Sequence, residues 1–395
     1  MLNRLLFFIV CVVCGCQKKT TTYVEPSLPS KSYYHLEAVW TKNMPTSTSI
    51  SYIGLYKNVV LYGIDDANFN ETIVAYDKLT GDSLWSHNCP GFLASGYCIY
   101  KNSMVYFVNG NSHMEAFDLE NGNNLWSFVP ENNGRYAGHD LFNGKVYYAV
   151  TMGYPINDST LVYEIDPNNG NYKVVFRLYS KDRNGNEIWL RFAEPWINPK
   201  GETIIPLLIR GYNNKESSSL SALNLTTKSF YFDYQDTIKG DPMLNWPVRI
   251  GDKVYYKGWD YHCRIDLNTK AIDYVKPIDD SLKANNRIQG LNNQIIFISA
   301  NNYHTSCYDL EGNLLWKVKD GGAGEYPMIS YKNKYYYTAG GNINCLNASG
   351  KMEWYSPPMP KSYRYFNGKM VLDESSGCLY TWSIDQINCL KIKYP

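Results

Sequence analysis

The sequence has 395 residues, of which 44% are hydrophobic, and a formal net charge of +1. Because its charges are almost balanced, the chain lacks the global basic field that draws a protein to nucleic acid. The length exceeds that of a usual single hydrophobic core, so one domain of this size requires a repetitive architecture.

The N-terminal segment is predicted to be a signal peptide. Arg4 supplies the positive charge at its start, and the apolar run from Leu5 to Val13 follows. This run has nine residues, whereas a membrane span needs about 20. The segment Val13-Cys14-Gly15-Cys16 resembles a bacterial lipobox, with Val13 and Cys14 as departures from its usual residues. The resemblance implies removal of residues 1–15 and lipidation of Cys16; an ordinary secretory signal is the alternative.

Residues 16–35 are expected to hold the lipidated Cys16 and a flexible tether. Most of the segment is polar, it contains two prolines, and it shows no hydrophobic period. The body would then contact a membrane through its lipid anchor alone. Gln17 is not the Asp that retains many bacterial lipoproteins at the inner membrane, so the predicted location is the outer membrane. Whether the body faces the periplasm or the outside stays open.

The stretch from Glu71 to Trp85 is predicted to hold two short antiparallel strands and a turn at Asp77 to Gly81. Six further segments repeat this pattern. The Asp or Asn of each copy lies at positions 77, 118, 166, 224, 266, 309 and 347, and the large residue after each turn is Trp85, Trp126, Val174, Phe232, Tyr274, Trp316 and Trp354. Spacings of 41, 48, 58, 42, 43 and 38 residues between copies are typical of a β-propeller.

The two ends of the body are predicted to share one blade. Leu36 to Lys42 reads as an isolated outer strand with Trp40 in the large-residue position, and residues 369–394 supply three strands without a fourth. Pairing these segments closes the ring and buries the flanks of the first and last blades. The prediction is therefore an all-β, eight-bladed β-propeller of four-stranded antiparallel blades over residues 36–395, with the last blade completed by the N-terminal strand.

The third and fourth blades contain extra residues at 153–157, 180–187 and 211–219. These segments carry Asn, Gly, Lys and Ser without an apolar pattern, so they are predicted to be rim loops. Tolerated surface loops and a functional face are both open interpretations.

The pattern A-x-D-x-x-T-G-x-x-x-W, which runs from Ala75 to Trp85, resembles the repeat of the pyrroloquinoline quinone (PQQ)-like propellers. The resemblance implies that Trp40, Trp85, Trp126, Trp316 and Trp354 are structural residues that pack between blades, with Asp77 and Gly81 in the turn. It also implies a small residue opposite each large one. That position holds Ala75, Ala116, Ala222, Cys307, Cys345 and Cys389, while Glu164 and Arg264 depart from it.

This family includes quinoprotein dehydrogenases and non-catalytic propellers, among them the scaffold lipoprotein of the outer-membrane β-barrel assembly machinery. The chain resembles that scaffold in its lipobox, length, blade number and ring closure. The dehydrogenases place their cofactor under a disulfide between adjacent cysteines, and no Cys-Cys pair occurs here. No C-x-x-C-H haem motif occurs either. We therefore expect no enzyme activity and no cofactor.

Other reactive residues give weaker signals. Cys89 and Cys98 flank the connection between the first two blades and are candidates for a disulfide, whereas Cys307, Cys345 and Cys389 are expected to be buried thiols. The six histidines show no paired spacing, and two Asn-rich segments that begin at Asp66 and Asp182 lack the glycine of a calcium loop. No metal site is predicted.

The predicted function is a non-catalytic, protein-binding scaffold lipoprotein of the bacterial cell envelope, with a role in outer-membrane protein assembly. A surface glycan-binding lipoprotein is the alternative, because 36 tyrosines exceed what the contacts between blades require. A PQQ-dependent dehydrogenase is a distant third. The body is expected to be monomeric and to bind no nucleic acid.

Overall fold

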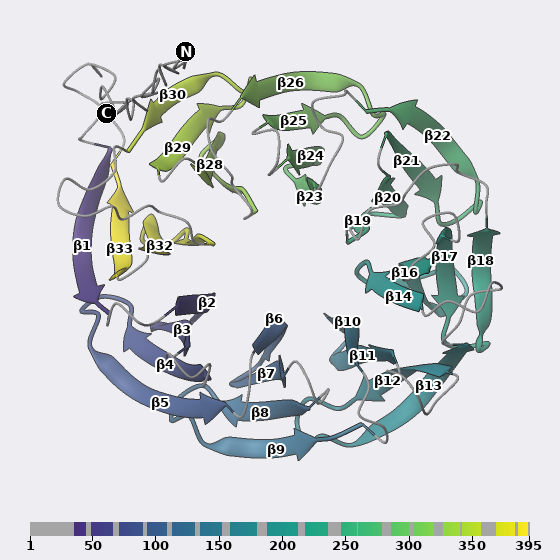
Figure 1. Cartoon of the computed structure of the whole chain (residues 1–395), viewed down its shortest axis with the longest axis horizontal. Coiled ribbons are helices and arrows are strands. Elements are labelled where there is room, and N and C mark those ends of the chain that lie inside the picture. The colour runs from purple at the N-terminus through teal and green to yellow at the C-terminus, as the bar shows by residue number, and fades with distance from the viewer. Residues whose placement is uncertain are drawn as a thin grey trace, which may run out of the picture.

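In the computed structural model, the described residues form 33 strands in eight sheets, arranged as a ring (Figure 1). The prediction of an eight-bladed β-propeller is confirmed. The structure describes residues 35–44, 49–65, 71–89, 93–108, 113–130, 135–151, 159–179, 188–211, 218–235, 246–258, 260–278, 286–299, 304–319, 327–339, 342–356, 369–383 and 386–393. The predicted signal peptide, Cys16 and all but the last residue of the tether lie outside these ranges.

Each blade is an antiparallel sheet whose first strand lies nearest the ring axis and whose fourth strand lies on the perimeter (Figure 1). Blade one contains β2 (Ser49–Tyr56), β3 (Val59–Asp65), β4 (Glu71–Asp77) and β5 (Ser83–Cys89). Blade two contains β6 (Leu93–Tyr100), β7 (Ser103–Val108), β8 (Met114–Asp118) and β9 (Asn124–Phe128). Blade three contains β10 (Arg135–Phe142), β11 (Lys145–Thr151), β12 (Ser159–Ile165) and β13 (Tyr172–Tyr179). Blade four contains β14 (Ile188–Phe192), β16 (Thr203–Gly211), β17 (Ser218–Asn224), β18 (Ser229–Gln235) and the short β15 (Trp196–Ile197), which pairs with β16.

The second half of the ring repeats this order. Blade five contains β19 (Val248–Ile250), β20 (Lys253–Lys257), β21 (Tyr261–Asp266) and β22 (Ile272–Pro277). Blade six contains β23 (Asn286–Leu291), β24 (Gln294–Ser299), β25 (His304–Tyr308) and β26 (Leu314–Lys319). Blade seven contains β27 (Ile329–Tyr331), β28 (Lys334–Ala339), β29 (Asn342–Asn347) and β30 (Met352–Tyr355). Blade eight contains β31 (Val371–Asp373), β32 (Cys378–Ser383), β33 (Gln386–Ile392) and β1 (Leu36–Asn43).

Blade eight joins the two ends of the chain, as predicted. β1 pairs antiparallel with β33 and places Trp40 opposite Cys389. Beyond the strands, the backbone N–H of Lys393 donates to the carbonyl of His35 at 2.7 Å, and its Nζ lies 2.7 Å from a carboxylate oxygen of Glu37. His35 stacks on Trp354 of blade seven with ring centroids 5.0 Å apart. The N-terminal strand is therefore held by both blade eight and blade seven.

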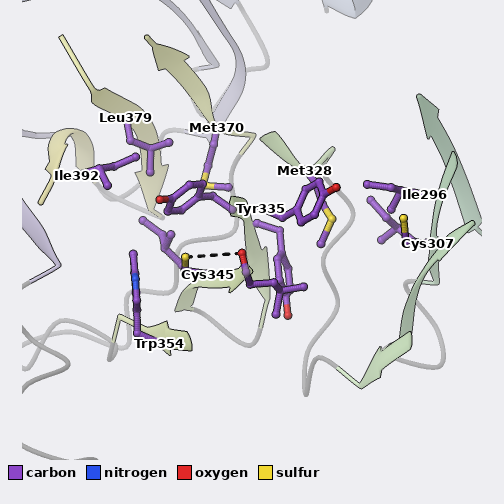
Figure 2. Packing of buried hydrophobic residues seen from close by; sticks show 14 of the residues in the cluster. Ile296, Cys307, Met328, Tyr335, Cys345, Trp354, Met370, Leu379 and Ile392 are labelled. Atoms are coloured by element: carbon purple, nitrogen blue, oxygen red, sulfur yellow. Dashed lines mark hydrogen bonds between the residues drawn. The ribbon is translucent and has the colours of Figure 1, made fainter. Parts of the chain in front are cut away.

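Buried apolar side chains fill the seams, which are the interfaces between neighbouring blades. Along one face of each sheet the alternate residues point into one seam, and along the other face into the next. Figure 2 shows the largest of these clusters among the described residues, in which Met328, Tyr335 and Cys345 of blade seven pack with Cys307 of blade six and Leu379 of blade eight. The seams form a continuous ring of hydrophobic cores rather than one central core.

The antiparallel order gives the ring two different faces. Turns between the first and second strands, and between the third and fourth, lie on one face, which we call the turn face. The remaining connections start and end on the opposite face. Of the predicted rim loops, 153–157 and 180–187 lie outside the described residues. The loop predicted at 211–219 is wrong at its ends, because Gly211 belongs to β16 and Ser218 begins β17.

Candidate functional site

The repeated turn follows from its residue types. Asp77 Oδ1 accepts hydrogen bonds from the backbone N–H groups of Leu79 and Thr80 at 2.8 and 2.9 Å. Gly81 adopts a φ of +72°, and its N–H donates to the Asp77 carbonyl at 2.9 Å. The Asp77 carboxylate is therefore bound by the backbone of its own turn. Asp77 and Gly81 shape the turn, as predicted.

The same glycine receives the tryptophan of the preceding blade. A Cβ built on Gly81 would lie 2.7 Å from the Trp40 ring, and the indole N–H of Trp40 donates to the Lys78 carbonyl at 2.9 Å. Trp85 repeats this arrangement at Gly122, and Trp126 repeats it at Gly170. In blades six and seven the corresponding pairs are Tyr274 with Gly312 and Trp316 with Gly350. The repeat motif therefore builds seams.

The strand pairing places a small residue opposite the large one in six blades. The pairs are Ala75 with Trp85, Ala116 with Trp126, Ala222 with Phe232, Cys307 with Trp316, Cys345 with Trp354, and Cys389 with Trp40. The three cysteines are buried free thiols, as predicted. In blade three the expected position is wrong: Val174 pairs with Tyr163, and Glu164 pairs with Lys173, because the bulge lies between Val162 and Tyr163.

Blade five replaces the apolar pair with a polar one. Arg264 lies opposite Tyr274, with its guanidinium carbon 5.3 Å from the ring centroid, and its Nε is 2.8 Å from Asp273 Oδ2. His262 is 2% exposed on the same seam. Burial, together with the charges of Lys276 and Lys257, lowers the pKa of His262 to about 4. These groups belong to the seam between blades five and six, where the ring centroids of His262 and Tyr308 lie 4.9 Å apart.

The predicted disulfide between Cys89 and Cys98 is absent from the structure, where both cysteines are buried free thiols. Cys89 packs with Leu61 and Met104 in the seam between blades one and two. Cys98 packs with Met114 in the seam between blades two and three. The prediction is wrong because the two thiols lie on opposite sides of blade two.

The most distinctive exposed group lies near the axis, on blades three to five. Trp246, just before β19 of blade five, is 36% exposed. The guanidinium carbon of Arg191, on β14 of blade four, lies 4.9 Å from its ring centroid. The edge of the indole reaches Gly138 on β10 of blade three, where a Cβ would lie 3.4 Å away. Trp246 thus spans the first strand of blade four.

Three further charged residues of blades three to five interact with one another. Arg249 Nη2 lies 2.6 Å from Glu194 Oε2, and its Nε donates to the Glu194 carbonyl at 3.1 Å. Burial and the negative charge of Glu194 raise the pKa of the Asp140 carboxyl to about 7, against the opposing charge of Arg249. We call Gly138, Asp140, Arg191, Glu194, Trp246 and Arg249 the axial cluster.

The axial cluster was not predicted from the sequence, because its residues lie outside the repeated turn and come from three blades. The one available sign in the sequence was that Trp246 does not occupy the large-residue position of the repeat. Within the described residues, no group of three or more His, Cys, Asp or Glu side chains could hold a metal ion. No helix in those ranges is long and apolar enough to cross a membrane.

Comparison with known proteins identifies the family. The family model described as "Outer membrane protein assembly factor BamB" matches residues 37–273, more than half of the chain. The chain belongs to this family. The match covers blades one to four, most of blade five and the whole axial cluster.

Solved structures agree with the BamB family fold. The crystal structure of BamB from Moraxella catarrhalis superposes with a TM-score of 0.61 at 14% identity, covering 90% of this chain and 99% of that one. A quinohemoprotein alcohol dehydrogenase from Comamonas testosteroni superposes with a TM-score of 0.65 at 10% identity, covering 92% of this chain and 78% of that one. At these identities the likeness shows the fold alone.

A curated relative is an enzyme. The chain is 26% identical over 120 residues to a quinoprotein ethanol dehydrogenase from Pseudomonas putida. That alignment covers 30% of this chain and only 19% of the dehydrogenase. The shared part is thus a small fraction of the enzyme.

Proposed function

We propose that this protein is a non-catalytic, protein-binding scaffold of the bacterial cell envelope that acts in outer-membrane protein assembly. The observation that carries the proposal is the BamB family match over residues 37–273. The closed ring supports it, because propeller faces present loops from all blades together to a large partner. The absence of a Cys-Cys pair in the sequence also favours a scaffold over a quinoprotein.

A depletion experiment in the source bacterium tests the assembly role. Depleting the protein should lower the amount of folded outer-membrane β-barrel proteins, measured by heat-modifiable migration on gels, and expression of the wild-type chain should restore it. Native purification from detergent-solubilised envelope should recover a β-barrel assembly protein. Unchanged β-barrel proteins after full depletion would contradict the proposal.

The non-catalytic part has a separate test. Titration of the purified protein with PQQ and Ca²⁺, followed by a dye-linked alcohol oxidation assay, should show neither saturable binding nor turnover. Saturable binding with oxidation would replace the scaffold by an enzyme.

The envelope location depends on Cys16, and a substitution tests it. Cys16→Ala should move the protein from the outer-membrane fraction to the soluble fraction, whereas Cys14→Ala should leave it in the membrane. Equal distribution of wild type and Cys16→Ala would contradict lipid anchoring at this residue.

A further inference from the structure

We propose that the axial cluster is a binding site for a neutral saccharide, with a pyranose ring stacked on Trp246 and its hydroxyl groups held by Asp140, Glu194 and Arg249. This role goes beyond the proposed scaffold function. The repeat does not require these residues, and they bring together an exposed tryptophan and four charged residues, Asp140, Arg191, Glu194 and Arg249.

The indole of Trp246 is the proposed stacking platform. The guanidinium carbon of Arg191 lies 4.9 Å from the indole ring centroid. The edge of the indole lies beside Gly138, where Phe192 also packs. Because blades four and three fix the indole in this way, a ligand need not order it. Trp246 nevertheless remains 36% exposed. A flat, preordered indole offers the amphipathic contact that the C–H face of a sugar ring needs.

Asp140 lies close to this platform along β10. Gly138 and Asp140 are alternate residues of β10, so their Cβ positions lie on the same face and about 7 Å apart. The edge of Trp246 rests at Gly138. In the proposed complex one pyranose ring spans this separation, with hydroxyl groups bonded to the Asp140 carboxyl.

Glu194 and Arg249 are the other polar groups of the proposed site. Phe192 packs beside Gly138, and Glu194 follows it by two residues. The ion pair with Arg249 holds the Glu194 carboxylate in place. The Glu194 carboxylate accepts hydrogen bonds from hydroxyl groups, and the Arg249 guanidinium donates to them. Paired carboxylate and guanidinium charges favour a neutral ligand, because an ionic ligand would have to compete with an existing ion pair. A neutral saccharide meets all these requirements.

The test uses the complete mature protein and four defined probes: maltohexaose, laminarihexaose, mannohexaose and chitohexaose, each titrated by calorimetry. At least one should bind saturably, with a Kd of about 10 µM to 1 mM, as one stacked ring and a few hydrogen bonds allow. Trp246→Ala and Asp140→Asn should each weaken binding at least about tenfold, and Trp246→Phe should give an intermediate Kd.

Phe230→Ala is the matched control, because Phe230 is an exposed aromatic residue, 41% accessible, on the perimeter strand β18. It should bind the probe with the wild-type Kd. Failure of all four probes to bind the wild type would overturn the proposal. Equal binding by wild type, Trp246→Ala and Trp246→Phe would also overturn it. A Trp246→Ala variant that loses a protein partner but no saccharide would assign the cluster to protein docking instead.

Discussion

The ring of Trp85 occupies the space that a side chain on Gly122 would need: a Cβ on that glycine would lie 2.7 Å from the indole. The indole N–H also donates to the carbonyl of Leu119, in the same turn, at 3.2 Å. Position 122 thus favours glycine for two reasons: the indole leaves no room for a Cβ, and a φ of +75° disfavours other residues.

A pair of substitutions separates these two reasons. Gly122→Ala should lower the free energy of unfolding by about 3 kcal/mol, because it adds a clash with Trp85 to the cost of a positive φ. Gly201→Ala should cost only about 1 kcal/mol, because Gly201 has a φ of +78° but no atom within 4 Å of its Cβ position. Urea unfolding of both variants measures the difference. Equal losses would show that the indole adds no constraint.

Removal of residues 36–44 should destabilise the whole ring. Trp40 is 8% exposed in the seam between blades eight and one, and truncation of a buried tryptophan alone costs about 3–5 kcal/mol. A melting curve should show one transition at a clearly lower temperature, and a synthetic peptide of residues 36–44 should partly restore it. Val39→Ser, an exposed position of the same strand, is the control and should melt as the wild type does. An unchanged transition in the deletion variant would refute closure by β1.

His262→Met should stabilise the protein. The Nε2 atom of His262 is buried without a hydrogen-bond partner among the described residues, and the equivalent position of blade two is Met114. Removing an unpaired buried polar atom should raise the free energy of unfolding by about 1 kcal/mol at neutral pH.

The same variant should change the dependence on pH. The pKa of His262 in the folded protein is about 4, below the value of about 6.5 in an unfolded chain. Protonation therefore favours unfolding: this contribution to stability is complete above pH 6.5 and is lost as the pH falls toward 4. Chemical unfolding between these pH values should show a smaller loss for His262→Met than for the wild type. His304→Met, at a partly exposed position, is the control; an identical pH dependence in wild type and His262→Met would contradict the assignment.

Cys89 and Cys98 should both react as free thiols once the protein unfolds. Iodoacetamide should label neither in the native protein, because both are buried, and should label both in denaturant without any reductant. Peptide mass spectrometry measures the labelling. A disulfide-linked peptide that contains both residues would show that the two seams are arranged differently.

The architecture was predictable because a propeller repeats its local rules. The spacing of the Asp and Trp positions counted seven blades, and the isolated strand around Trp40 supplied the eighth. The departure of the seam between blades five and six was also visible in the sequence, because Arg264 and Tyr274 both differ from the motif. Within the first seven blades, residues close in the sequence determine the contacts, and the eighth was predictable because each end of the body was left with an incomplete blade.

Errors arose where a contact depends on which side of a sheet a residue faces, or on more than one blade. Cys89 and Cys98 are near in sequence, yet blade two separates them. In blade three the bulge lies two positions earlier than in the other copies, so that Val174 lies opposite Tyr163. Trp246 reaches Gly138 across a whole blade, more than 100 residues away. No periodic pattern encodes such a contact, so it needed the three-dimensional structure.

The pairing of β1 with β33 also fixes the order of events during biosynthesis. Thr41 in β1 hydrogen bonds to Asn388 in β33, 347 residues later. The first strand to leave the ribosome must therefore wait for the last one, and loop closure over that distance is slow. Until then the flanks of blades one and eight stay exposed to aggregation, and a chain that ends early cannot hide them. Ring closure thus makes completion of synthesis a condition for a fully protected fold.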